Sequence, residues 1–148
     1  MLEPGDSAPN VTAHNQHGET VAPDFVAPTV VYFYPRDFTG GCTIEASEFQ
    51  ATLPEFRELD VTVYGVSTDD VDTHADFADE EGLLFDLLAD PDGSVATAFG
   101  VSTDGGAADR ATFLLADGEV VAAYGGVEPA GHAREVLTDA RSEFVVGG

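Results

Sequence analysis

The sequence contains one cysteine, Cys42, which follows two glycines in the stretch YPRDFTGGCTIEAS (34–47). The apolar run TVVYFY (29–34) before it is rich in the β-branched and aromatic residues of a buried strand. After it, apolar residues from Ala46 to Leu59 recur at helical spacing. Cys42 is therefore expected in the first turn of a helix, where free backbone N–H groups and the helix dipole favour a thiolate. Such a sulfur is suited to nucleophilic attack.

A lone cysteine is more often a small buried hydrophobic residue than a nucleophile. The residues around Cys42 change that judgement, because Pro35, Thr39, Cys42 and Glu45 spell P-x-x-x-T-x-x-C-x-x-E directly after the strand. This motif resembles the active-site signature of the peroxiredoxins. The words YFYPRDFTGGCT are most similar to the peroxiredoxin Q branch, also called bacterioferritin comigratory proteins, and the resemblance extends over nearly the whole chain.

The resemblance implies a thioredoxin-like fold and a thiol-dependent peroxidase that reduces hydrogen peroxide and organic hydroperoxides. Cys42 would be the peroxidatic nucleophile, and the backbone N–H groups of Gly41 and Cys42 would help to bind the peroxide. Thr39 would hold the peroxide through its hydroxyl, and Pro35 would shield the thiolate from water. Two further residues match the family pattern: the arginine that leans over the sulfur, Arg110, and the orienting helix-borne glutamate, Glu45.

Two positions depart from the family pattern. Gly40 stands where the family usually has proline, which leaves the loop less restricted in the unfolded chain. Ser47 stands where many members of the branch carry a resolving cysteine. Because the chain has no second cysteine, a one-cysteine mechanism is expected. The oxidised Cys42 would be reduced by an external thiol, on a thioredoxin-like protein or a small molecule, or would pair with Cys42 of another subunit. No cofactor and no metal are expected, and the protein could be a monomer or a homodimer.

Two other functions are weighed against the peroxidase. A disulfide oxidoreductase needs C-x-x-C, and Thr39 occupies the first of those positions. A non-catalytic thioredoxin-like binding or chaperone module could keep a vestigial cysteine. Such a module would not need Arg110 beside the sulfur, which favours the peroxidase.

The elements around the motif alternate between strands and helices. A hairpin is expected over 11–21, further strands over 61–67 and 83–90, and a C-terminal hairpin turning at the Asp-Gly pair 117–118. Helices are expected after Cys42, before the helix-stopping Gly82, over 94–100 and over 131–144. This order indicates an α/β fold with a central mixed sheet flanked by helices, forming a single domain over 1–148.

The charge of the chain restricts its partners. Twenty-eight acidic residues oppose five arginines and no lysine, for a net charge of −23. The acids are dispersed and the chain is 43% hydrophobic, which indicates a folded acidic surface rather than disorder. This surface disfavours nucleic acid and anionic membranes, and its lack of lysine favours a halophile with a salt-filled cytoplasm. The N-terminus lacks the features of a signal peptide, so a cytoplasmic location is expected.

Several residues are given structural interpretations only. His14 and His17 are expected at the surface of the first hairpin, and His74 and His132 on the exposed faces of helices. The remaining helical arginines are expected to pair with nearby acids; they are Arg57, Arg134 and Arg141.

Overall fold

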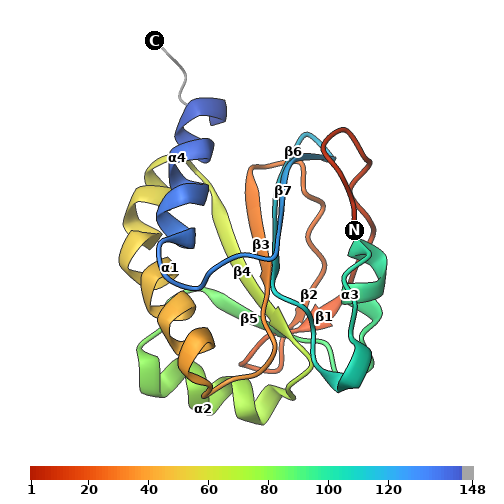
Figure 1. Cartoon of the computed structure of the whole chain (residues 1–148), viewed down its shortest axis with the longest axis vertical. Coiled ribbons are helices and arrows are strands. Elements are labelled where there is room, and N and C mark those ends of the chain that lie inside the picture. Colours follow the sequence, from red (N-terminus) through yellow and green to blue (C-terminus); the bar gives the residue numbers. More distant parts are fainter. Residues whose placement is uncertain (145–148) are drawn as a thin grey trace.

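A computed structural model describes residues 1–144 and contains a seven-stranded mixed sheet in the order β2-β1-β5-β4-β3-β6-β7 (Figure 1). The central strands β3, β4 and β5 are parallel, whereas β6 is antiparallel to β3 and β1 to β5. The mixed sheet and the N-terminal hairpin are thus as predicted. The strands are β1 (Ala13–His14), β2 (Thr20–Val21), β3 (Thr29–Phe33), β4 (Thr62–Ser67), β5 (Asp86–Ala89), β6 (Ala111–Ala116) and β7 (Glu119–Gly125).

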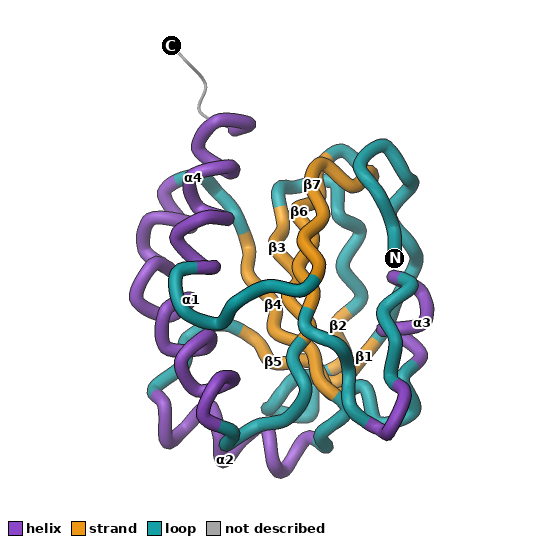
Figure 2. Tube along the Cα trace, in the orientation of Figure 1, coloured by secondary structure: helices purple, strands orange, loops and turns teal. Residues whose placement is uncertain are grey.

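Helices cover both faces of this sheet (Figure 2). Tyr32 and its same-face neighbours pack against α1, α2 and α4, whereas Val31 and Phe33 pack against α3 on the opposite face. The two cores follow from the strand period of two, because successive β3 side chains point to opposite sides. The helices are α1 (Gly40–Glu58), α2 (Val71–Glu81), α3 (Ser94–Phe99), α4 (His132–Phe144) and a short 3₁₀ helix, η1 (Asp104–Gly106), which the sequence did not predict.

Helix α1 begins two residues before Cys42, so the cysteine lies in its first turn as expected. The predicted apolar stripe is buried from Ala46 to Phe56, whereas Leu59 is the C-cap and only partly buried. Pro54 lies inside the helix without ending it. Cys42 and Glu45 continue the same buried stripe toward the N-terminus, since residues three and four apart share one helix face. The two predicted site residues of α1 therefore point toward the sheet.

The sheet register explains why Arg110 approaches this helix. Strands β3 and β6 are antiparallel with Phe33 paired to Ala111, so the C-terminal end of β3 lies beside the N-terminal end of β6. Arg110 immediately precedes β6 and therefore lies at the edge of the sheet where the 35–39 loop leaves β3. Residues almost 70 positions apart are brought together by this single pairing.

The helix and turn signals read from the sequence are confirmed for α2 and the C-terminal hairpin. The Asp70 carboxylate accepts a hydrogen bond from the Thr73 N–H at 2.8 Å and caps the start of α2. Gly82 ends that helix with a left-handed backbone, φ 65°.

Among residues 1–144, no helix combines the length and hydropathy that crossing a bilayer would require.

Candidate active site

The Cys42 sulfur lies beneath the surface at the N-terminus of α1. The residue is 1% exposed and forms no disulfide. Thr39 is the N-cap, and the first helical hydrogen bond runs from the Thr43 N–H to the Thr39 carbonyl at 2.9 Å. The N–H groups of the first turn, those of Gly41 and Cys42 among them, have no acceptor within the helix and can bind a ligand.

Arg110 bridges Cys42 and Glu45, the two predicted site residues of α1. Its Nη2 lies 3.5 Å from Cys42 Sγ, and its Nη1 donates to Glu45 Oε1 at 2.7 Å. The Arg110 side chain is 17% exposed, so its positive charge is poorly screened by water. Burial lowers the pKa of Arg110, but Glu45 and Cys42 raise it by more, and the net shift is upward. The guanidinium is therefore a fixed cation beside the sulfur.

Glu45 is fully buried and shares only one of its two oxygens with Arg110. Among the described residues, Oε2 finds no hydrogen-bond partner. Burial raises the pKa of Glu45 from 4.5 to about 7, against the opposing effect of the Arg110 charge. The carboxyl group therefore holds a proton more readily than an exposed glutamate would.

Glu45→Gln is expected to remove a pH dependence of stability. The folded protein retains the Glu45 proton up to about pH 7, whereas the unfolded chain releases it near pH 4.5. The free energy of unfolding of the wild type should therefore fall, relative to the variant, by about 3 kcal/mol as the pH rises through that interval. Urea unfolding at several pH values measures the difference. Parallel pH profiles for the two proteins would contradict the raised pKa.

Thr39 and Pro35 lie on the loop that joins β3 to α1. Thr39 is exposed, and its hydroxyl donates to the Arg36 carbonyl at 3.0 Å. Because its proton is engaged there, the Thr39 oxygen is left to accept a hydrogen bond from a bound molecule. Pro35 is partly buried two residues after the end of β3, and it offers no N–H group of its own. The structure thus brings Thr39, Cys42, Glu45 and Arg110 together around the first turn of α1, and it places Pro35 on the loop that leads into this helix.

Pro129, in the loop between β7 and α4, was not singled out from the sequence. A Cβ atom placed on Gly41 would lie 3.2 Å from both Pro129 Cγ and Arg110 Nη2. Gly41 therefore permits the close approach of the guanidinium and of the 126–131 loop. A Cβ on Gly40 would meet no atom within 4 Å.

These two neighbouring glycines give a matched pair of variants. Gly41→Ala is expected to displace Arg110 from the sulfur and to lower kcat/KM for peroxide about tenfold, since a shift below 1 Å at a reacting centre has a large effect. Gly40→Ala is expected to keep activity within about twofold. Peroxide consumption by both purified proteins measures the effect. Equal activities would show that the Gly41 contact does not position the arginine.

The surface positions predicted for two histidines were wrong. His74 is fully buried, with its ring between Asp37 and the Leu88 carbonyl. His132 is 4% exposed, and its Nε2 lies 2.7 Å from the Thr112 hydroxyl. Both side chains point into the core, where they meet polar groups. The spacing of the apolar residues did not reveal these buried positions.

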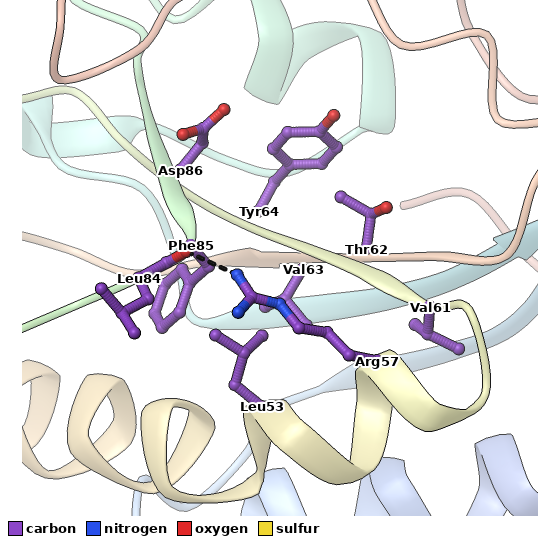
Figure 3. Close-up of a pocket in the computed structure, with 9 residues that line it drawn as sticks. All are labelled: Leu53, Arg57, Val61, Thr62, Val63, Tyr64, Leu84, Phe85 and Asp86. Carbon is purple, nitrogen blue, oxygen red and sulfur yellow. Dashed lines mark hydrogen bonds between the residues drawn. The ribbon is translucent and has the colours of Figure 1, made fainter.

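The helical arginines follow the prediction in part. Arg134 and Arg141 both pair with Glu55, at 3.5 and 3.2 Å. Arg57 instead donates to the Leu84 carbonyl at 2.8 Å, and it lines a surface hollow of about 280 Å³ beside Tyr64 (Figure 3). That hollow is formed by the C-terminal part of α1, by β4 and by residues 84–86, and Cys42 is not among its lining residues.

Comparison with known proteins identifies relatives over nearly the whole chain. The model of the AhpC/TSA family matches residues 4–146. The chain is 41% identical to Peroxiredoxin Bcp of Xanthomonas campestris, over 73% of this chain and 72% of that protein. It is similar to the crystal structure of a Xylella fastidiosa PrxQ mutant, with a TM-score of 0.89, 32% identity and coverage of 97% and 98%.

A structure of the Xanthomonas campestris bacterioferritin comigratory protein is also similar, with a TM-score of 0.84, 34% identity and coverage of 90% and 91%. The thioredoxin-like peroxiredoxin fold is thereby confirmed, and the peroxidase interpretation is supported over a non-catalytic module. The buried cysteine at a helix start, the guanidinium against it and these similarities have one explanation: the chain belongs to the AhpC/TSA family and is a peroxiredoxin of the Bcp/Q type, a thiol-dependent peroxidase.

Proposed function

We propose that Cys42 is the peroxidatic nucleophile of this enzyme. Its thiolate attacks the terminal oxygen of a hydroperoxide in line with the O–O bond. A sulfur–oxygen bond forms as the O–O bond breaks, which gives a sulfenic acid on Cys42, and the departing alkoxide or hydroxide takes a proton and leaves as an alcohol or water. The sulfur loses two electrons, and the peroxide gains them.

Each group around the sulfur is assigned a role in this step. Arg110 stabilises the thiolate and the negative charge that develops on the departing oxygen. The backbone N–H groups of Gly41 and Cys42 hold the peroxide oxygens, and the Thr39 oxygen accepts a hydrogen bond from the hydroperoxide O–H group. Pro35 limits the access of water to the sulfur, and Glu45 orients Arg110. The observation that carries the proposal is the bridge of Arg110 between Cys42 Sγ and Glu45 Oε1.

The substrate class and the reductant follow from the same site. Hydrogen peroxide and organic hydroperoxides both present the O–O bond, and the related Xanthomonas campestris protein has alkyl peroxide reduction activity. Since Cys42 is the single cysteine, its sulfenic acid must be reduced by an external thiol, from a thioredoxin-like protein or a small molecule. The role is antioxidant defence.

The proposal is tested by following hydrogen peroxide and cumene hydroperoxide in the presence of dithiothreitol or a thioredoxin system. Consumption of each peroxide should require both the protein and the thiol, with ping-pong kinetics. Mass spectrometry of the peroxide-treated protein, trapped with dimedone, should find the adduct on the peptide that contains Cys42. Peroxide loss without modification of Cys42 would refute the assignment.

We further propose a cytoplasmic, monomeric or homodimeric protein from a halophile. A cysteine that must be returned to its reduced form between turnovers needs a reducing compartment. The −23 net charge supports a salt-rich surrounding, because dense like charges destabilise the compact state in dilute buffer. Among the described residues, exposed arginines offset few of these acids, since Arg134 and Arg141 share one partner.

Salt is therefore expected to stabilise this protein. Raising the NaCl concentration from about 0.05 M to about 2 M shortens the screening length from more than 10 Å to a few ångströms and removes most of the repulsion. The midpoint of thermal unfolding should rise by about 10 °C or more, and peroxide reduction should be faster in the high-salt buffer. Calorimetry and the peroxide assay measure both. A midpoint that falls or stays constant would contradict the halophilic interpretation.

A further inference from the structure

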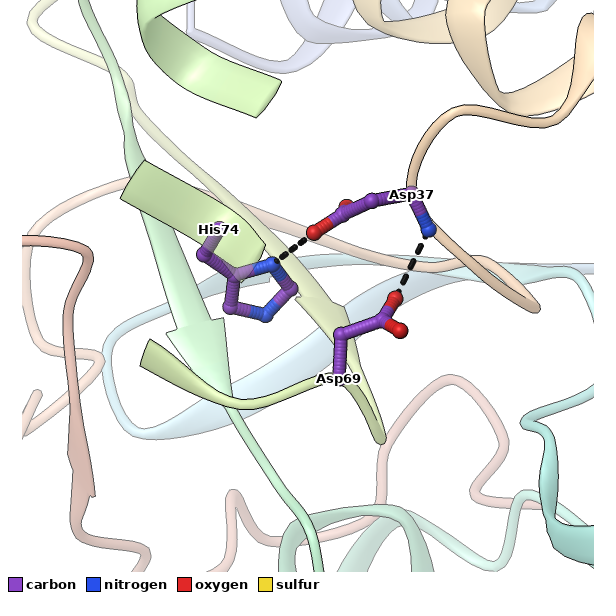
Figure 4. Close-up of side chains that lie close together, drawn as sticks. All are labelled: Asp37, Asp69 and His74. Carbon is purple, nitrogen blue, oxygen red and sulfur yellow. Dashed lines mark hydrogen bonds and ion pairs between the residues drawn. The ribbon is translucent and has the colours of Figure 1, made fainter. Parts of the chain in front are cut away.

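A second polar cluster joins the 35–39 loop to α2, outside the group that surrounds the sulfur. It consists of Asp37, Asp69 and His74, which come from the loop, from the residues after β4 and from α2 (Figure 4). Asp37 is 6% exposed and His74 is fully buried. Asp37 Oδ2 lies 2.6 Å from His74 Nδ1, and the Asp37 N–H donates to Asp69 Oδ2 at 2.7 Å.

The bonding pattern of this cluster is that of an anchor rather than of a metal site. Asp37 Oδ1 accepts from the Tyr34 hydroxyl at 2.6 Å, and Asp69 Oδ2 also accepts from the Ser67 hydroxyl at 2.8 Å. His74 Nε2 faces the Leu88 carbonyl at 3.1 Å. Both nitrogens of His74 are thus engaged, and an ion would have to displace several short hydrogen bonds to bind here.

The proton positions follow from the partners. The Leu88 carbonyl can only accept, so His74 Nε2 carries a proton. A second proton must lie between His74 Nδ1 and the Asp37 carboxyl group, because two lone pairs would repel each other at 2.6 Å. Burial raises the pKa of Tyr34, which keeps its hydroxyl protonated as a donor to Asp37.

Asp37 is the one side chain of the 35–39 loop that is buried below a tenth of its surface. It stands midway between Pro35 and Thr39. The next residue, Phe38, has a left-handed backbone with φ 65°, which costs a non-glycine residue roughly 1 kcal/mol and needs support from its surroundings. That support also comes from α2, since the Phe38 ring packs against Phe77 with centroids 5.2 Å apart. His74 and Phe77 lie one helical turn apart, so α2 holds the loop at two adjacent points.

We infer that His74 and Asp37 are positioning residues for the peroxide reaction. Their hydrogen bond fixes the Pro35–Thr39 loop to α2, and neither residue is assigned a contact with Cys42 or the substrate. The inference rests on the proposed function of that loop. Losing the Asp37–His74 bond frees the loop to shift and separates the Thr39 oxygen from the position that the peroxide needs. The second-order rate constant of Cys42 with hydrogen peroxide should then fall although every residue that contacts the peroxide is intact.

Two conservative variants separate the two bonds of His74. The amide nitrogen of His74→Asn can replace Nδ1 and still donate to Asp37, whereas that of His74→Gln replaces Nε2 and reaches only toward Leu88. Stopped-flow measurement should find the rate constant about tenfold lower for His74→Gln and within about threefold of wild type for His74→Asn. Asp37→Asn, which weakens the same bond, should resemble His74→Gln and serves if that variant does not fold.

Val95→Ala provides the control for stability, because it creates a cavity in the core on the opposite face of the sheet. It should leave the rate constant within about twofold of wild type even where urea unfolding shows an equal loss of stability. In ¹⁵N-histidine spectra of the wild type, the downfield proton of His74 Nδ1–H should be present, and Asp37→Asn should shift or remove it.

The inference fails if folded His74→Gln or Asp37→Asn reacts within twofold of wild type, or if Val95→Ala slows the reaction as much at matched stability. These results differ from a failure of the proposed function, in which the wild-type protein itself would not form a sulfenic acid on Cys42. An active wild type with unaffected His74 variants would overturn the positioning role alone.

Discussion

Cys42→Ser is expected to lower kcat/KM for hydrogen peroxide by about 10⁴-fold or more, to the level of the assay without enzyme. A serine hydroxyl is not ionised near pH 7 and its oxygen cannot accept a second oxygen from the peroxide, so no sulfenic acid can form. The effect should be the same for organic hydroperoxides, since each of them must pass through the same sulfur. The measurement is peroxide consumption at saturating dithiothreitol.

The control for this variant is its stability. Serine is slightly smaller than cysteine and can keep a hydrogen bond with Arg110, so the free energy of unfolding should change by only about 1 kcal/mol. A matched surface variant, Ser94→Ala in α3, should retain full activity. Peroxide consumption that survives Cys42→Ser in a folded protein would mean that another group carries the reaction.

Arg110→Ala is expected to lower kcat/KM by about 10²- to 10³-fold while Cys42 remains in place. Complete ionisation of an ordinary thiol near pH 7 raises its reactivity only about thirtyfold, which corresponds to about 2 kcal/mol. A faster peroxidase must therefore stabilise the charge that develops as the O–O bond breaks. Arg110 Nη2, 3.5 Å from the sulfur, is the cation placed to do so.

Two comparisons sharpen this prediction. Arg110→Lys keeps the charge but lacks the planar fork that bonds Glu45 through Nη1 and the sulfur through Nη2, so it should recover only part of the lost rate. Arg134→Ala removes an exposed arginine that pairs with Glu55 and should leave the rate within about twofold. If Arg110→Ala and Arg134→Ala had equal activities, the guanidinium would have no special role at the site.

Much of the fold could be predicted because the local patterns agree with the tertiary structure. The β3 run is buried on both faces and reads as continuous apolar residues, and the α1 stripe has helical spacing. Boundaries were less predictable. The strand expected over 83–90 is confined to Asp86–Ala89, since Leu83–Phe85 precede the ladder that pairs β5 with β4. The start of α1 was predictable, since Cys42 lies in its first turn as the apolar spacing after it indicates.

The candidate site was predictable where chemistry lies in one short motif. Pro35, Thr39, Cys42 and Glu45 are close in sequence, and the family resemblance added Arg110, which the β3–β6 pairing then carries to the sulfur.

The contacts that support this motif were not predictable, because they join segments whose pairing depends on the whole fold. His74 reads as an ordinary residue on a helix, yet it is buried against a loop residue 37 positions away. Pro129 reads as part of a plain loop, yet it packs close to Gly41. Sequence periodicity locates buried apolar residues, and it gives no signal for a polar residue that is buried by a contact between distant segments.

The most direct test of the central claim is a single-turnover reaction of the reduced protein with one equivalent of hydrogen peroxide at pH 7. The claim is that a thiolate at Cys42, held by Arg110 and the first turn of α1, attacks the peroxide. We expect stoichiometric loss of the one thiol, a dimedone-reactive sulfenic acid on Cys42, and a rate constant at least about 10³-fold above that of free cysteine. A rate constant equal to that of free cysteine, or oxidation only after denaturation, would contradict the claim.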